Sequence, residues 1–155
     1  MANTLMSTLE IKQMALLEID NVILGFPQSH ILAIESLSNV NALRTTEKSS
    51  GIVSYGTSEI PVYTFNNDLT LMDKPATNNR FCIAIKHMDE NEPFAVMCDA
   101  VNQYTIEDNT DIKTMPPLMH NPDSPVIGLV KKDDTLIFIS TAESMRSYIY
   151  SQEQL

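Results

Sequence analysis

Residues 51–65, GIVSYGTSEIPVYTF, predict two β-strands joined by a tight turn. The chain has only four glycines, yet Gly51 and Gly56 both lie in this stretch. Because glycine adopts backbone conformations that other residues avoid, we interpret the stretch as a corner of a small β-barrel. Pro61 is expected to open the second strand, where a missing amide donor is tolerated.

Short apolar runs of similar length continue through the rest of the chain. Asp20 and Asn21 separate two of them, and both residue types favour turns. Many short strands at regular spacing favour small β-barrels over a parallel sheet. The runs that predict strands are residues 14–19, 22–26, 51–55, 59–65, 80–88, 94–101, 126–130 and 135–139. Alternation within these runs predicts a core that contains Ile83, Ile85, Val96, Leu136 and Phe138.

Two other segments carry helical patterns. Residues 28–40 are ambiguous between helix and strand, because their apolar residues fit a helical spacing at Ile31, Ile34 and Leu37. Residues 140–150 predict a C-terminal helix. Ser140 is its expected N-cap, and Glu143 stands at the capping-box spacing.

Composition narrows the class of protein. The formal net charge of −10 disfavours binding to nucleic acid and to anionic membrane surfaces. Cys82 and Cys98 lie in apolar runs, so we expect buried free thiols in a reducing compartment. The chain shows no signal-peptide pattern and no apolar run long enough to insert in a membrane. We therefore expect a cytoplasmic protein with a leader at residues 1–13 and one domain at residues 14–152.

Candidate catalytic and metal-binding residues are sparse. His30, His87 and His120 are isolated from one another and from the cysteines, and no metal or nucleotide motif occurs. Asp99 lies within an apolar run, where a carboxylate needs hydrogen-bond partners. A structural aspartate is favoured there over the general acid or base of a hydrolase, which would need a second titratable group. We predict no cofactor, no metal site and no enzymatic activity.

The order of these features resembles the CheW-like domain, the coupling module of bacterial chemosensory arrays. The interval between the glycine and the Pro-Val pair of the barrel corner is the interval of that family. A glycine on the second strand, an Asp-x-Val motif, a Pro-containing loop and a glycine in the last hairpin also match. The matching positions are Gly25, Gly51, Pro61, Val62, Asp99, Val101, the Met-Pro-Pro of residues 115–117 and Gly128, within a resemblance that covers residues 14–150.

The resemblance implies a mainly β fold. This fold has two small SH3-like five-stranded barrels packed about a shared hydrophobic core, with short helices and a C-terminal helix. The resemblance also implies a non-enzymatic adaptor that couples the cytoplasmic tip of a chemoreceptor to a CheA-type histidine kinase, in chemotaxis or in pilus-based motility. It implies structural roles for Gly25, Gly51, Pro61, Asp99 and Gly128.

A partner-binding surface is implied by the same resemblance, at Ile31, Ala33, Ile34, Val53, Tyr55, Gly56 and Thr57. The chain departs from the family there. The family's turn arginine falls on Gly56, the glycine after it on Thr57, and a glutamate after the first hairpin on Ala33. We expect an interface that has re-formed on other residues, with Tyr55 as an apolar anchor. The alternative is a small-molecule sensor or binding module that uses the seam between the barrels.

Overall fold

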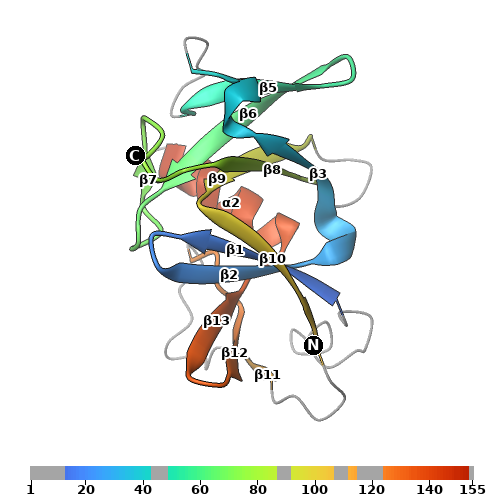
Figure 1. Ribbon diagram of the computed structural model, residues 1–155, viewed down its shortest axis with the longest axis vertical. Helices are drawn as coiled ribbons and strands as arrows, with labels where there is room; N and C mark the ends of the chain where they lie inside the picture. Colours follow the sequence, from blue (N-terminus) through green and yellow to red (C-terminus); the bar gives the residue numbers. More distant parts are fainter. Residues whose placement is uncertain (1–12, 43–48, 87–91, 107–111, 115–123, 154–155) are drawn as a thin grey trace.

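The chain is mainly β, as the sequence predicts. The computed structural model describes residues 13–42, 49–86, 92–106, 112–114 and 124–153 (Figure 1). These residues form thirteen β-strands, two 3-10 helices and one α-helix. The helices are η1 (Gln28–His30), η2 (Leu37–Asn39) and α2 (Ala142–Glu153). The histidines at 87 and 120 and the Met-Pro-Pro at 115–117 lie outside the described residues, as does the predicted leader except Gln13, which begins the first strand.

The strands form two sheets. The first has the strand order β10 (Ala100–Thr105), β1 (Gln13–Ile19), β2 (Val22–Pro27), β13 (Thr135–Ile139), β12 (Gly128–Lys132) and β11 (Ile112–Thr114). The second has the order β3 (Ile31–Ser36), β8 (Phe81–Ile85), β9 (Phe94–Cys98), β6 (Ser58–Phe65), β5 (Gly51–Tyr55) and β4 (Val40–Asn41), and β7 (Leu71–Met72) pairs with β6. Without the short strands β4, β7 and β11, each sheet has the five strands that were predicted for each barrel.

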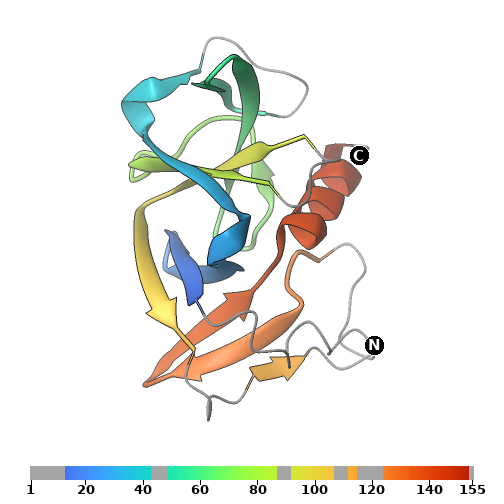
Figure 2. The same ribbon diagram turned by 90° about the vertical axis from the view of Figure 1, so that its right-hand side faces the viewer.

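The second sheet curls back on itself. β3 and β4 stand at opposite ends of its strand order, yet they follow each other in the chain through η2. Ala33 of β3 and Val40 of β4 pack against the same cluster of buried side chains. In Figure 1 this sheet lies above the first, and Figure 2 shows α2 along one side of the molecule, at the level where the sheets meet.

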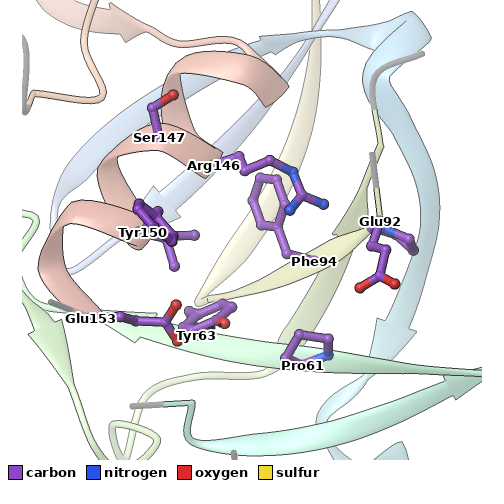
Figure 3. A pocket seen from close by; sticks show the side chains of 10 residues that line it. Pro61, Tyr63, Glu92, Phe94, Arg146, Ser147, Tyr150 and Glu153 are labelled. Atoms are coloured by element: carbon purple, nitrogen blue, oxygen red, sulfur yellow. Dashed lines mark hydrogen bonds between the residues drawn. The ribbon is translucent and has the colours of Figure 1, made fainter. Parts of the chain in front are cut away.

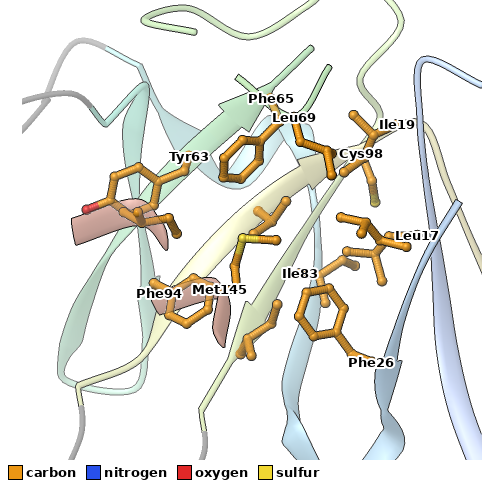
Figure 4. Close-up of a cluster of buried hydrophobic side chains, with 14 of the residues drawn as sticks. Leu17, Ile19, Phe26, Tyr63, Phe65, Leu69, Ile83, Phe94, Cys98 and Met145 are labelled. Atoms are coloured by element: carbon orange, nitrogen blue, oxygen red, sulfur yellow. The ribbon is translucent and has the colours of Figure 1, made fainter. Parts of the chain in front are cut away.

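A hydrophobic cluster between the sheets is the predicted shared core (Figure 4). It contains Leu17 and Phe26 from the first sheet, Ile83 and Val96 from the second, and Met145 from α2. Each sheet also has a cluster of its own. That of the first is built around Met14, Leu16, Val130, Ile137 and Ile139, and that of the second around Val53, Ile60, Val62, Cys82, Ala84, Ala95 and Met97.

Central strands are buried on both faces. In β8, Ile83 and Ile85 point into the shared core, while Cys82 and Ala84 point into the interior of the second sheet. All four are at most 1% exposed. The alternation in this run predicted only one buried face, and the second is buried because the curled sheet encloses an interior of its own. A run buried on both faces reads as continuously apolar.

Two core predictions need correction in the last hairpin. Leu136 is 45% exposed, because it is the second residue beyond the β12–β13 turn and pairs with the exposed Lys131. Phe138 is only partly buried, although it packs against the shared core. The fully buried side chains of β13 are Ile137 and Ile139, on the other face of the strand. The predicted burial of Ile83, Ile85 and Val96 is confirmed.

The two helical patterns have different outcomes. Residues 31–36 form β3 and pair with β8, with an irregular register between Ile31 and Ala33 that disturbs the period-two alternation. The C-terminal helix is present, but its N-cap is Thr141 rather than Ser140. The Thr141 hydroxyl accepts the amide of Ser144 at 3.1 Å, which satisfies one of the amides left free at a helix start.

Candidate functional site

The β5–β6 hairpin forms the predicted corner. Tyr55 pairs with Ser58, so Gly56 and Thr57 alone make the turn. Gly56 has φ +61°, while Thr57 is not among the residues with positive φ. A positive φ at only the first central residue is typical of a type II′ turn, which favours glycine at that place. The predicted use of Gly56 for its backbone conformation is confirmed.

The exposed residues of this hairpin lie toward its tip, from Ser54 to Glu59. Tyr55 is 42% exposed, and residues 56–59 are exposed with it. Val53 and Ile60, at the base of the same hairpin, are at most 1% exposed and belong to the interior cluster of the second sheet. Val53 was predicted to bind a partner, but its burial gives it a packing role instead. The candidate contact surface on this hairpin therefore begins at Tyr55.

Gly51 and Pro61 keep their predicted structural roles for reasons other than those expected. A Cβ on Gly51 would stand 2.8 Å from Cγ1 of Val40 and 3.0 Å from the carbonyl oxygen of Asn41, so close packing requires the glycine. Pro61 lies in the middle of β6 rather than at its start. It is tolerated because β6 pairs with β9 only from Val62 onward.

The other predicted contact residues lie on β3. Ile34 is 51% exposed, whereas Ile31 packs partly buried against the shared core and Ala33 against the interior of the second sheet. β3 and β5 are not neighbours in the sheet, and the structure links them through η2 and β4. The predicted surface is therefore two separate exposed points, Ile34 and the Tyr55 tip, on one barrel.

Asp99 ties three segments together. Its Oδ2 accepts the Asp20 amide at 2.9 Å and the Asn78 side-chain amide at 2.8 Å, and its Oδ1 accepts the Asn79 side-chain amide at 2.9 Å. Asn79 is 4% exposed and in turn accepts the Ala76 amide. Both carboxylate oxygens are thus hydrogen-bonded to the framework, which supports the structural role and gives a hydrolase no support.

Gly25 and Gly128 also lie inside the first barrel. A Cβ on Gly25 would stand 2.7 Å from Cε of Met14 and 3.2 Å from Cγ2 of Ile137, so a side chain there would displace the end of the Met14 side chain in the interior of the first sheet. Gly128 is buried at the start of β12 and pairs with Ile139. These positions serve packing between strands.

The buried thiols differ from reactive cysteines in their acidity. Burial raises the pKa of Cys82 to about 12, with a contribution from the nearby Glu35 carboxylate. Burial also raises the pKa of Cys98 to about 12, with smaller contributions from Cys82, Asp99 and Glu18. Because the thiolate is the nucleophile and the metal ligand, neither cysteine is prepared for such chemistry near neutral pH. Both are free thiols, as predicted.

A groove beside α2 was not predicted from the sequence. It has a volume of about 410 Å³ and lies between α2, β6 and the start of β9 (Figure 3). Tyr63, Phe94 and Tyr150 line it together with Arg146 and Glu153. These residues are far apart in sequence, and the only signal was an arginine within the predicted C-terminal helix.

Within the described ranges, no group of three or more histidine, cysteine, aspartate or glutamate residues could hold a metal ion. The helices of those ranges also include none that is long and apolar enough to cross a membrane.

The comparison with solved structures shows the fold. No family model matches the chain, and no curated protein matches it. Among solved structures, the crystal structure of the scaffolding protein TtCheW from Thermoanaerobacter tengcongensis matches with a TM-score of 0.62 and 21% sequence identity. The match covers 83% of this chain and 88% of that chain. The chain therefore has the CheW-like fold of two SH3-like subdomains, with a strongly diverged sequence.

Proposed function

We propose that this chain is a non-enzymatic cytoplasmic adaptor that couples the tip of a chemoreceptor to a CheA-type histidine kinase, in chemotaxis or pilus-based motility. The observation that carries the proposal is the fold, which is shared over 83% of the chain with a scaffolding protein. An adaptor needs exposed contact surfaces rather than convergent reactive groups. The thiols and Asp99 are engaged in the framework, which is consistent with such a role.

The tip of the β5–β6 hairpin is the proposed contact with the kinase or the receptor. It presents Tyr55, a residue type that is enriched among the energetically dominant residues of interfaces. The resemblance places the family's turn arginine at Gly56, so this tip lacks that charge. The contact should then depend on apolar burial more than on ion pairs.

Tyr55→Ala tests this contact. We expect the affinity for the cognate kinase or receptor tip to fall by about 1 kcal/mol or more, because the truncation removes the anchor. The binding is measured by calorimetric titration with the partners encoded in the same genome. Leu136→Ala is the matched control, since Leu136 is 45% exposed on the β12–β13 hairpin and should leave binding unchanged. Unchanged melting temperatures would show that both variants are folded.

The salt dependence of the same titration adds a second readout. Salt screens exposed charge pairs but not apolar burial, so the affinity should be nearly constant between low and moderate ionic strength. A steep loss with salt would show that charges such as Glu35 or Glu59 carry the contact. Equal affinity of Tyr55→Ala and the unmodified chain would remove Tyr55 from the site. If neither partner binds at any salt concentration, the adaptor proposal itself is wrong.

The sensor alternative receives no support from the seam between the barrels. The seam is filled by side chains of the shared core, and those of Leu17, Phe26, Ile83, Val96 and Met145 are fully buried. A ligand there would have to displace packed side chains. The groove described above lies instead between α2, β6 and the start of β9.

A further inference from the structure

The groove beside α2 combines aromatic walls with charges of both signs. Tyr63, Phe94 and Tyr150 supply the aromatic surface, Arg146 supplies the positive charge, and Glu92 and Glu153 supply the negative charges. Figure 3 shows the Arg146 guanidinium beside the Phe94 ring, with Glu92 on one side of the groove and Glu153 on the other. This groove uses none of the residues proposed for the hairpin contact.

One hydrogen-bond donor of Arg146 lacks an acceptor. Its Nη2 is buried and has no hydrogen-bond partner among the described residues. The guanidinium carbon lies 5.8 Å from the centre of the Phe94 ring, a cation–π contact that gives Nη2 no hydrogen-bond acceptor. A buried donor on a charged group is unfavourable when it has no partner, so such groups in native proteins call for an explanation. A carboxylate matches the planar fork of an arginine.

The two glutamates limit which acids fit. Glu153 is held in place, because its Oε2 accepts the Tyr63 hydroxyl at 3.1 Å. Glu92 is exposed at the opposite side. Two carboxylates around one guanidinium repel a ligand with several negative charges, and so does a chain with a net charge of −10. A single carboxylate with a cationic neighbour fits this pattern.

Tyr150 extends the apolar surface beyond the groove. It is 66% exposed. Tyrosine and arginine are residue types enriched at protein interfaces. A free amino acid would leave most of this ring uncovered, whereas an extended segment with an apolar side chain next to the acid would cover it. The open groove and the exposed ring therefore favour a macromolecular occupant.

We propose that this groove docks a segment of a protein partner that presents one glutamate or aspartate side chain beside an apolar residue and a basic residue. The carboxylate binds Arg146, the apolar side chain packs on Tyr150 and Phe94, and the basic side chain lies near Glu92 or Glu153. This is a second contact surface, beyond the hairpin contact of the adaptor. Its failure would leave the hairpin proposal untouched, because the two tests use different residues.

The test uses short blocked peptides and amide chemical shifts of the full chain. The acidic probe is acetyl-Leu-Glu-Leu-Lys-amide, and sodium glutamate represents a small molecule. The probe called neutral replaces the glutamate by glutamine; it is neutral at this one position and keeps the charge of its lysine. We expect the acidic probe to shift the amides of Phe94, Arg146 and Tyr150. The neutral probe should bind about 10-fold more weakly, which is the effect of one charge-assisted hydrogen-bonded pair.

Three variants separate the site from general charge effects. Arg146→Met removes the charge but can still pack on Phe94, and it should abolish the preference for the acidic probe. Arg146→Lys keeps the charge without the fork and should keep only part of the preference. Arg80→Met is the control, because Arg80 is an exposed residue outside the groove and its loss changes the net charge equally. Melting curves of all three check the fold.

Several results would overturn the proposal. Equal binding of the acidic and neutral probes would show that Arg146 does not recognise a carboxylate. Saturation of the same amides by sodium glutamate at the concentration of the peptide would assign the groove to a small molecule. If Arg80→Met and Arg146→Met lost the preference for the acidic probe equally, the preference would be an effect of net charge alone. If the peptides shifted no amide signal, the groove would not be a docking site.

Discussion

The β1–β2 and β5–β6 hairpins both turn through two residues, but only the first turn is tied to the rest of the chain. Asp20 and Asn21 have φ values of +48° and +70°, as in a type I′ turn, and the Asp20 amide donates to Asp99. At the second turn, nothing lies within 4 Å of the place where a Cβ on Gly56 would stand. One hairpin is part of the framework, and the other ends in open space.

This difference follows from where each hairpin lies. β1 contributes Ala15, Leu17 and Ile19 to the shared core and Met14 and Leu16 to the interior of the first sheet, so both faces of the strand are occupied. In β5, burial ends at Val53, and Ser54 and Tyr55 continue beyond the barrel. A hairpin that continues past its barrel can be altered at its tip with little effect on packing, which suits a contact surface.

Removing the Asp99 carboxylate should have the largest effect. Asp99→Ala leaves the Asp20 amide and the buried Asn79 side-chain amide without their acceptor. We expect a loss of about 1.5–3 kcal/mol in the free energy of unfolding, the range for hydrogen bonds to charged groups. Urea denaturation measures it.

A matched aspartate provides the control for that loss. Asp134 is exposed in the β12–β13 turn, so Asp134→Ala should stay within about 0.5 kcal/mol of the unmodified chain. If both substitutions have equal effects, Asp99 does not tie the first hairpin to the framework.

Gly56→Ala should have a smaller effect, because it disturbs the free turn. The surroundings leave room for a methyl group, so the destabilisation comes from the left-handed backbone and should be about 1–2 kcal/mol. Gly56→Asn should lower the free energy of unfolding by less, since asparagine tolerates this conformation. Thr57→Ala is the control and should be nearly neutral. A Gly56→Ala variant as stable as the unmodified chain in thermal unfolding would contradict the positive φ.

Much of the fold could be predicted from local patterns. The strands on both sides of Asp20-Asn21 and Gly56-Thr57 were readable because turn residues separate apolar runs there. The segment with Ile31, Ile34 and Leu37 could not be predicted as a strand, because an irregular pairing with β8 disturbs its alternation. Which register a strand adopts against a distant partner is decided by the sheet, not by the segment itself.

Burial and sites were harder to predict than strands. The second buried face of β8 depends on the curl of its sheet. The exposure of Leu136 follows from its place near the β12–β13 turn. The order of motifs indicated functional or structural roles for Tyr55 and Asp99. It also indicated a partner contact at Val53, whose side chain is buried. The Arg146 groove joins β6, β9 and α2, so no local pattern contains it.

The two cysteines allow the regions under the two hairpins to be compared in one protein. Cys98 lies in the shared core below the β1–β2 hairpin, and Cys82 lies in the barrel that carries β5–β6. Burial raises the pKa of each thiol from 9.0 to about 12, so the folded state keeps the proton longer than the unfolded chain does. Their contribution to stability is therefore complete below pH 9 and is lost as the pH rises toward 12.

Up to pH 9 the expected effect of the thiols on stability is the smallest of the series. At pH 9 the loss should be under about 1 kcal/mol for each thiol, growing with further increase in pH. Urea midpoints between pH 7.5 and pH 10 measure it, and a Cys82→Ala/Cys98→Ala variant corrects for the tyrosines and lysines that titrate in the same range. The variant should show a flatter decline, even if it is less stable throughout. Parallel declines would mean that the thiols are as acidic in the folded chain as in the unfolded one. A thiol reagent adds a second comparison: if it modified Cys82 before Cys98 at pH 8, the barrel that carries the β5–β6 hairpin would open first.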